Sequence, residues 1–331
     1  MEFEKRIFAA SADNFNELAL DLFNYQYQYN LVYRHFCDAL KIRAEKINTI
    51  EKIPCIPISF FKTHVVKTGE FEASAVFESS GTTQTINSKH FIKDLGIYRK
   101  SFTSCFEKFY GPVNKKCILG LLPSYLERGN SSLVMMTDAL IKASDHPLSG
   151  FYLYDHEKLH RTILHNELLK LPTMLIGVTY ALLDFAEQYP MQLKHTIVME
   201  TGGMKGRREE LTRQEVHAIL QKQLGISLVH SEYGMTELLS QAYSKGDGIF
   251  HCPGWMRILI RDEDDPFHIT TAVDGHTKSS TGLINIIDLA NIHSCAFIAT
   301  DDIGRLHNNN SFEVLGRMDR SEMRGCSLLA V

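Results

Sequence analysis

The sequence predicts an α/β protein in which layered α/β sheets are followed by a smaller C-terminal β region. From about residue 60 onward, short apolar runs alternate with longer amphipathic stretches, a pattern typical of strands joined by crossover helices. The first sixty residues instead repeat apolar side chains at helical spacing. The apolar runs after Cys252 are short and separated by polar turns, which favours antiparallel strands.

Changes of hydrophobic period separate a helical N-terminal segment (1–57) from an α/β body that begins at residue 58. The first part ends near Pro54 and Pro57, because proline lacks an N–H group and disfavours helix in the residue before it. In the body we expect strands at 117–122, 151–154, 174–178, 196–199 and 226–230, and helices at 132–142, 157–169, 180–188 and 208–223. Further strands are expected at 256–260, 282–287, 296–299 and 312–315.

Composition excludes several classes of protein. Lys and Arg number 35 against 39 Asp and Glu, a net charge of -4, so broad electrostatic capture of nucleic acid is not expected. The seven cysteines contain no C-x-x-C pair, which argues against a zinc ribbon or a disulfide framework. Because no stretch reaches about 18 apolar residues and the N-terminus lacks a signal-peptide core, we expect a cytoplasmic protein without a transmembrane segment.

Four segments carry residue types that suit nucleotide chemistry. The hydroxyl-rich run Phe77-Glu-Ser-Ser-Gly-Thr-Thr-Gln-Thr85 offers donors for phosphate oxygens, although alone it is more typical of a polar turn. The second, His230-Ser-Glu-Tyr-Gly-Met-Thr-Glu237, follows a predicted strand, where ligands bind in α/β sheets. The others are Phe297-Ile-Ala-Thr-Asp-Asp-Ile-Gly-Arg305 and Gly316-Arg-Met-Asp-Arg-Ser-Glu-Met-Arg-Gly-Cys326.

In this order and spacing, the four segments resemble the motifs of the adenylate-forming superfamily, which includes acyl-CoA synthetases and luciferases. Three more segments are similar to the acyl-protein synthetase (LuxE) branch: Leu121-Leu-Pro-Ser-Tyr-Leu-Glu-Arg-Gly-Asn-Ser-Ser-Leu133, Glu200-Thr-Gly-Gly-Met-Lys-Gly-Arg207 and Arg324-Gly-Cys-Ser-Leu328. The resemblance covers about residues 55–331. It implies the large-domain fold of adenylate-forming enzymes for residues 58–315, followed by a hinge and short C-terminal tail at 316–331.

The resemblance also implies which residues bind ATP and Mg²⁺. The loop that would hold the β- and γ-phosphates consists of Ser79, Ser80, Gly81, Thr82 and Thr83. Thr236 would contact the α-phosphate, and Glu237 would coordinate Mg²⁺.

For the nucleoside, the resemblance implies an adenine wall formed by the backbone of Gly202 and Gly203. Tyr233 would stack on the adenine, and Gly234 would permit the tight turn that follows. Asp302 would accept hydrogen bonds from both ribose hydroxyls. Arg317 would contact the ribose or the phosphates. Asp319 would be the hinge about which enzymes of the family change conformation.

At such a site, a substrate carboxylate attacks the α-phosphate of ATP and gives an acyl-adenylate and pyrophosphate. The resemblance implies that the substrate is a fatty acid. In acyl-protein synthetases the acyl group then moves to a cysteine near the C-terminus before delivery to a partner, and Cys326 matches that place. Arg320 and Arg324 would lower its pKa, and Glu322 opposes them. A free cysteine is also commonly a small buried hydrophobe, so both interpretations of Cys326 stay open. The acceptor protein would be a reductase or a carrier protein.

Departures from the motifs leave a second function open. Gln84 follows the phosphate loop where many superfamily members continue with Gly-x-Pro-Lys, and Asp301 replaces the glycine of a Thr-Gly-Asp motif. The sequence ends just after the hinge motif, so we expect the mobile lid domain, with its catalytic lysine, to be absent or truncated. The alternative is therefore an acyl- or nucleotide-binding subunit without independent turnover.

One competing motif is His156-Glu-Lys-Leu-His160, which matches the H-E-x-x-H pattern of zinc peptidases. In a peptidase, the helix carrying this motif faces a metal. Here Asp155 is expected to cap the helix and to place His156 in its exposed first turn. We therefore interpret the two histidines as structural, and a metallopeptidase remains the competing hypothesis.

Overall fold

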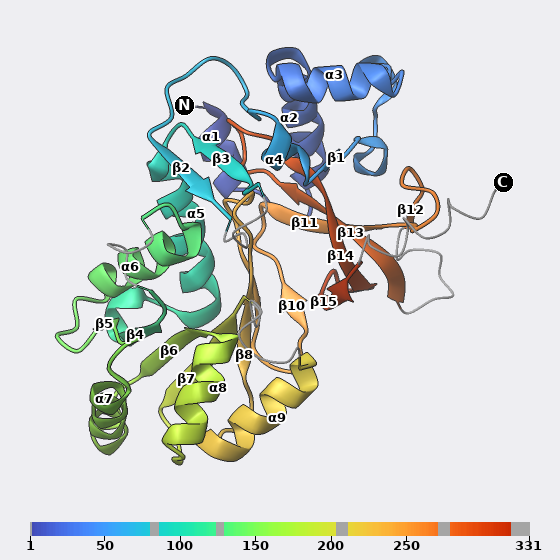
Figure 1. The fold of residues 1–331 in the computed structure, drawn as a ribbon. Coiled ribbons are helices and arrows are strands. Elements are labelled where there is room, and N and C mark those ends of the chain that lie inside the picture. The colour runs from blue at the N-terminus through green and yellow to red at the C-terminus, as the bar shows by residue number, and fades with distance from the viewer. Residues whose placement is uncertain (1, 80–85, 124–128, 203–210, 271–278, 319–331) are drawn as a thin grey trace.

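The computed structural model describes residues 2–79, 86–123, 129–202, 211–270 and 279–318, which form a large mixed sheet flanked by helices (Figure 1). In this part of the chain the sheet has 13 strands, in the order β12-β11-β13-β14-β15-β10-β9-β8-β7-β6-β4-β5, with β1 paired to β14. Its parallel half contains β4 (Cys117–Leu121), β5 (Gly150–Phe151), β6 (Thr173–Val178), β7 (Thr196–Thr201) and β8 (His230–Tyr233). The residues of β4 and β6 are all buried, as expected for parallel strands covered by helices.

The predicted crossover helices are present. They are α6 (Ser132–Ser144), α7 (His156–Leu168), α8 (Thr179–Gln188) and α9 (Arg213–Leu224), and α5 (Leu95–Tyr110) precedes β4. Helix α7 begins as predicted, because the Asp155 carboxylate accepts the Lys158 N–H at 2.9 Å. Helix α9 begins at Arg213 rather than at residue 208, because Thr212 and Glu215 form a capping box. Strand β5 ends at Phe151, short of the predicted 151–154, because the chain turns there toward the Asp155 cap.

Strand β8 departs most from the prediction, since it covers His230–Tyr233 instead of 226–230. Helix α9 ends at Gly225, which adopts a left-handed conformation with φ of 61°. The side chain of Gln221 then donates to Ser227 O at 2.7 Å, so the following residues form a turn before the strand. The first half of the second motif therefore lies within the sheet and only its second half follows a strand.

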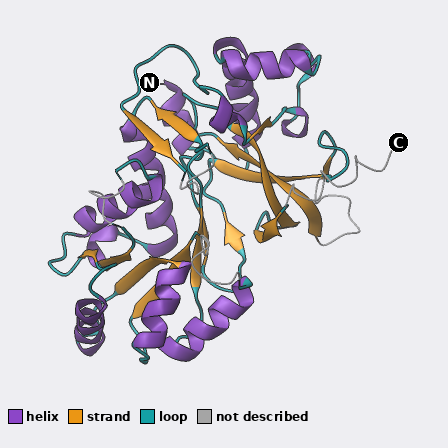
Figure 2. Cartoon of the chain, viewed as in Figure 1, coloured by secondary structure: helices purple, strands orange, loops and turns teal. Residues whose placement is uncertain are grey.

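The C-terminal β region is antiparallel, as predicted, and is continuous with the parallel half through the β8–β9 pair (Figure 2). It contains β9 (Ala242–Ser244), β10 (Phe250–His251), β11 (Met256–Arg261), β12 (Ile269–Thr270), β13 (Ser279–Asp288), β14 (Phe297–His307) and β15 (Phe312–Arg317). A separate two-stranded hairpin is formed by β2 (Ala75–Glu78) and β3 (Lys89–Ile92). The first and second motifs thus lie on different sheets and meet only through tertiary contacts.

The N-terminal segment is helical, as predicted, and packs at the top of the molecule in Figure 1. It consists of α1 (Glu2–Phe8), α2 (Phe15–Tyr29), α3 (Leu31–Ala39) and two short 3-10 turns (Ala44–Lys46 and Ile50–Lys52), followed by β1 (Ile56–Pro57) and α4 (Phe60–Thr63). The buried Gln26 side chain donates to Asn291 O at 2.8 Å and accepts from Ala296 N at 2.9 Å. These bonds fasten α2 to the loop between β13 and β14.

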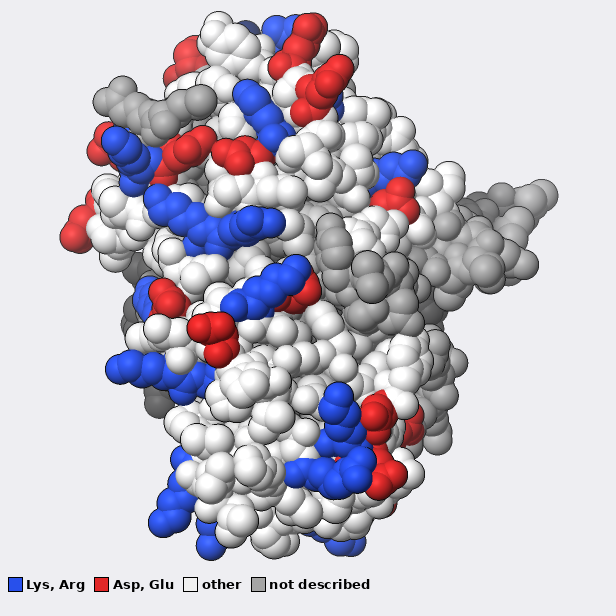
Figure 3. Space-filling view, turned by 90° about the vertical axis from the view of Figure 1, so that its left-hand side faces the viewer, with Lys and Arg blue, Asp and Glu red and all other residues white. Residues whose placement is uncertain are grey.

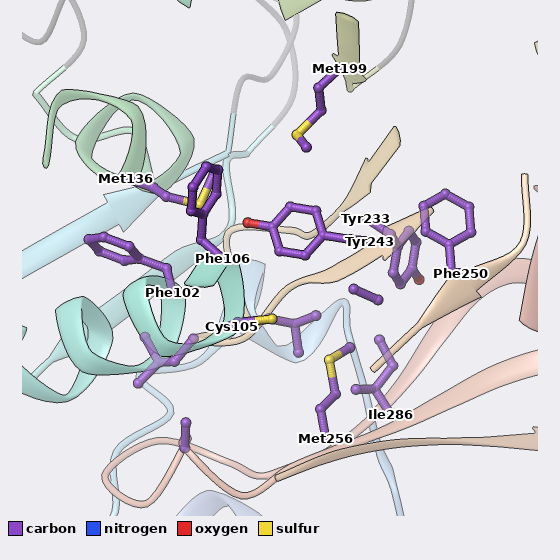
Figure 4. Close-up of a cluster of buried hydrophobic side chains, with 14 of the residues drawn as sticks. Phe102, Cys105, Phe106, Met136, Met199, Tyr233, Tyr243, Phe250, Met256 and Ile286 are labelled. Carbon is purple, nitrogen blue, oxygen red and sulfur yellow. The ribbon is translucent and has the colours of Figure 1, made fainter. Parts of the chain in front are cut away.

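A buried aromatic cluster joins α5 to the sheet (Figure 4). Phe106 and Tyr110 of α5 pack against Tyr243 of β9, with ring centroids 6.5 and 5.4 Å apart. Tyr233, at the end of β8, lies in the same region and packs edge-on against Phe250 at 5.9 Å. The cluster therefore buries one side of the strand that carries the second motif.

The surface carries charges of both signs. On the face shown in Figure 3, basic and acidic side chains are interspersed rather than segregated. In the residues that the structure describes, none of the helices has the length and apolar character needed to cross a membrane.

Candidate active site

A cavity of about 850 Å³ lies at the carboxyl ends of the parallel strands. Residues at the ends of four strands line it: Leu122 after β4, Val178 in β6, Thr201 and Gly202 at β7, and Glu232 and Gly234 at β8. Helices α6 and α8 add apolar side chains, among them Met136 and Ala181. This is the position at which α/β sheets bind ligands, because loops from neighbouring parallel strands converge there.

The loop after β8 brings Gly234 and Thr236 to the cavity wall. His90 of β3 supports it from behind, since its Nδ1 lies 2.8 Å from Thr236 O. Burial lowers the pKa of His90 to about 4, so the ring is neutral, and Nδ1 must carry the proton to donate to a carbonyl. Strand β3, which follows the first motif, thus contacts the loop that carries the second.

Glu237 lies behind this wall. Its side chain is buried and is not among the residues that line the cavity. Burial raises the pKa of its carboxyl, while a hydrogen bond from Ser88 and the charges of Arg317 and Lys62 act in the opposite direction. Asn291 donates to the Glu237 carbonyl at 2.9 Å.

Asp288 holds the chain just beyond the motif. Its fully buried carboxylate accepts from Leu239 N at 2.8 Å, Ser240 N at 3.0 Å, Ser240 Oγ at 2.6 Å and Ala290 N at 3.1 Å. Four donors satisfy a buried carboxylate well. Asp288 therefore joins β13 to the loop that carries Thr236 and Glu237.

Three of the predicted nucleotide residues meet at the antiparallel side of the site. The Tyr233 hydroxyl donates to Asp302 Oδ2 at 2.7 Å, and Arg317 Nε lies 3.9 Å from Asp302 Oδ1. Asp302 and Arg317 face each other across the β14–β15 ladder. Burial raises the pKa of Asp302, and both partners oppose that rise. Residues from the second, third and fourth motifs are thus in direct contact.

The phosphate loop and the adenine wall are described in part. Ser79 follows β2 and closes the base of its loop, because its Oγ accepts from Ser88 N at 2.9 Å. Gly202 follows β7 with φ of 72°, and its carbonyl accepts from Thr179 Oγ1 at 3.0 Å. Seven predicted positions lie outside the described residues: Ser80, Gly81, Thr82, Thr83, Gly203, Asp319 and Cys326.

The sequence interpretation missed two residues. Glu232 was quoted within the second motif without a role, yet it lines the cavity. Asp288 ends a long apolar strand, and a carboxylate directly after such a run is the available signal. Its partners Leu239 and Ser240 lie about fifty residues away, so nothing local identifies them.

The two histidines of the H-E-x-x-H segment pack against the end of α8. His156 is half-buried rather than exposed, and its Nδ1 lies 3.1 Å from Gln188 Oε1. The His160 ring stacks on Tyr189 with centroids 4.7 Å apart. These contacts favour a structural role.

Replacing His160 by Ala is expected to lower the free energy of unfolding by about 1 kcal/mol, the scale of one ring contact. It should leave unchanged the acid-dependent pyrophosphate exchange that the motifs predict. Urea unfolding and pyrophosphate exchange measure the two effects. One zinc ion per chain by elemental analysis, lost in His160→Ala, would instead support the metallopeptidase.

Comparison with solved structures places the fold among adenylate-forming ligases. A 2-hydroxyisobutyryl-CoA ligase bound to its acyl-adenylate and CoA matches with a TM-score of 0.60 at 10% identity, over 93% of this chain and 76% of that one. ATP-bound MatB from Rhodopseudomonas palustris matches with a TM-score of 0.54 at 14% identity, over 74% of this chain. The chain spans about half of the MatB chain, 48%.

Within that fold class the chain belongs to the acyl-protein synthetase family, LuxE, whose model matches residues 3–330. The match extends the predicted resemblance through the N-terminal helices. A long-chain-fatty-acid–luciferin-component ligase of Aliivibrio fischeri is 24% identical over 95% of this chain and 86% of its own length. Its counterpart from Photorhabdus luminescens is 40% identical over 67 residues, which are 20% of this chain and 57% of that relative.

Proposed function

We propose that this protein activates a long-chain fatty acid with ATP as an acyl-adenylate and passes the acyl group to a protein thiol. The observation that carries the proposal is the cavity at the carboxyl ends of the parallel strands, with Thr236 in its wall and the Tyr233–Asp302–Arg317 cluster beside the same loop. The names of the two ligase relatives support the choice of acid. The apolar side chains of α6 and α8 suit an acyl chain.

In the first half-reaction, a carboxylate oxygen of the fatty acid attacks the α-phosphorus of ATP. The bond from that phosphorus to the bridging oxygen of pyrophosphate breaks, and pyrophosphate leaves with the electron pair. The protein's part is to position the reactants and to stabilise charge. Thr236 would donate to the α-phosphate, Asp302 would accept from the ribose hydroxyls, and Arg317 would contact ribose or phosphate oxygens.

Mg²⁺ is commonly held by one or two carboxylates together with substrate phosphates. Glu237, directly after Thr236, is the carboxylate that the motif offers, but its side chain is buried beside the Ser88 hydroxyl and is not part of the cavity lining. In this conformation Glu237 therefore does not fit a phosphate-bound Mg²⁺ in the cavity. Ser88 and Asn291 keep Glu237 in place on the protein side.

In the second half-reaction, the acyl group passes to a thiol, either Cys326 or a cysteine of an acceptor such as a reductase or carrier protein. The cysteines that the structure describes are free, which supports a reducing, cytoplasmic location.

Acid-dependent exchange between ATP and labelled pyrophosphate tests the first half-reaction. We expect ATP–pyrophosphate exchange in the presence of tetradecanoate and no exchange without an added acid. Binding of ATP without exchange for any acid would instead support a nucleotide-binding subunit. Labelling with radioactive tetradecanoate then tests the acceptor: the label should be lost in Cys326→Ser and kept in the matched control Cys252→Ser.

A further inference from the structure

Glu232 is one of three acidic residues that line the cavity, with Glu78 and Asp184, and the proposed function uses none of them. It lies in β8, one residue before Tyr233, and its half-buried side chain lines the cavity together with Gly234 and Thr236. Polar and apolar side chains are mixed in this wall, and a half-buried carboxylate there loses part of its hydration, which a partner or a function has to offset.

The position of the carboxyl is tightly defined by its neighbours. The Thr201 hydroxyl, at the end of β7, donates to Oε2. The other oxygen, Oε1, lies only 2.3 Å from the place that a Cβ on residue 234 would occupy. A side chain at 234 would require the carboxyl to shift, so in this position Oε1 lies close to the backbone of the loop that leads to Thr236.

The groups around Glu232 disfavour its charge. Burial raises the pKa of Glu232 to about 7, against the effect of the Thr201 hydrogen bond, and the charge of Glu200 on β7 adds to the rise. The other titratable groups that sense its charge are Tyr98, Cys105 and Tyr110 of α5 and Tyr243 of β9. None of these is a cation. A carboxylate in such surroundings accepts a proton readily near neutral pH.

We propose that Glu232 is the general base of the second half-reaction, taking the proton from the thiol that attacks the acyl-adenylate. This assignment rests on the proposed function. The sulfur forms a bond to the acyl carbon, the bond from that carbon to the AMP oxygen breaks, and AMP leaves with the electron pair. The thiol proton moves to a carboxylate oxygen of Glu232 and is later released to water.

The chemistry of the two half-reactions explains why only the second needs this base. A fatty acid is already ionised at neutral pH, so its attack on ATP transfers no proton. A thiol has a pKa of about 8.5 and is mostly protonated, so its attack is helped by a base within reach. Removing Glu232 should therefore separate the half-reactions.

The experiment uses Glu232→Gln, which keeps the size of the side chain and an acceptor for Thr201. Pyrophosphate exchange with tetradecanoate should stay within about threefold of wild type. Thiol discharge is measured as AMP release from synthetic tetradecanoyl-AMP with N-acetylcysteamine as the acceptor. It should fall by about 100-fold or more at pH 7.5, the scale of a lost general base. Glu157→Gln, on the exposed side of α7, is the matched control and should match wild type.

The pH profile supplies a readout that a structural role would not change. In wild type, discharge should rise as Glu232 ionises near pH 7 and then level off. In Glu232→Gln, the rate of thiol discharge should instead follow the fraction of acceptor thiol that is ionised, which increases up to about pH 9. Glu232→Asp keeps a carboxylate, so its pH profile should retain an inflection at a lower pH than the pKa of the free acceptor thiol.

The outcomes separate this assignment from the proposed function. If Glu232→Gln leaves both thiol discharge and pyrophosphate exchange unchanged, the role of Glu232 is overturned and the proposed function stands. Exchange and discharge reduced equally overturn it too, because Glu232 then acts in adenylation. If wild type itself neither exchanges pyrophosphate nor discharges the adenylate, the proposed function fails, and the assignment fails with it.

Discussion

Replacing Asp302 by Asn is expected to weaken ATP binding by about 10- to 100-fold. The carboxylate is proposed to accept both ribose hydroxyls, and hydrogen bonds to a charged acceptor contribute about 1.5 to 3 kcal/mol. An amide retains one acceptor oxygen for the Tyr233 hydroxyl but presents an NH₂ group on the side of Arg317. Titration calorimetry with ATP measures the change.

The neighbouring Asp301 provides the matched control, since Asp301→Asn removes the same charge one residue away. It should bind ATP within about twofold of wild type. Tyr233→Phe removes the hydroxyl that orients Asp302. Its ATP affinity should fall between those of Asp301→Asn and Asp302→Asn. Equal binding by Asp301→Asn and Asp302→Asn would contradict a ribose contact at Asp302.

Replacing Asp288 by Asn is expected to lower the free energy of unfolding by about 2 to 4 kcal/mol. The carboxylate accepts four hydrogen bonds from donors in two segments. Asparagine presents an NH₂ group toward some of these donors, so buried N–H groups lose their acceptor. Urea unfolding followed by tryptophan fluorescence reports the change, because Trp255 Nε1 donates to Ser240 Oγ in the same network.

Ser240→Ala is the control for this prediction. It removes one hydroxyl and leaves the backbone donors paired, so it should reduce stability by about 1 kcal/mol. If Asp288→Asn and Ser240→Ala have the same free energy of unfolding, the backbone hydrogen bonds from Leu239 and Ala290 contribute little to stability.

Much of the fold was predictable because its signals are local. Continuous apolar runs identified β4 and β6, and a carboxylate before an amphipathic stretch identified the start of α7 at Asp155. The order of motifs identified the family, which the match over residues 3–330 confirms. Strand β8 was misplaced because the apolar residues before it form a turn, held by a side chain of the preceding helix.

The candidate site was predictable only as a set of residues. The motifs named Tyr233, Asp302 and Arg317, and the structure brings them into contact. It also places Glu237 behind the cavity wall, which no pattern indicated. The roles assigned to these residues stay predictions until nucleotide binding is measured.

The sequence by itself determined the alternation of strands and helices, the family and the residue types available for chemistry, because periodicity, capping and motifs are properties of neighbouring residues. The tertiary structure alone decided which carboxylates are buried and which of them border the cavity. Glu232 and Glu237 are five positions apart in one motif, yet one lines the cavity and the other is enclosed behind it. Burial and charge depend on groups from distant strands, here β7 for Glu232 and β15 for Glu237, and these come together only when the sheet forms.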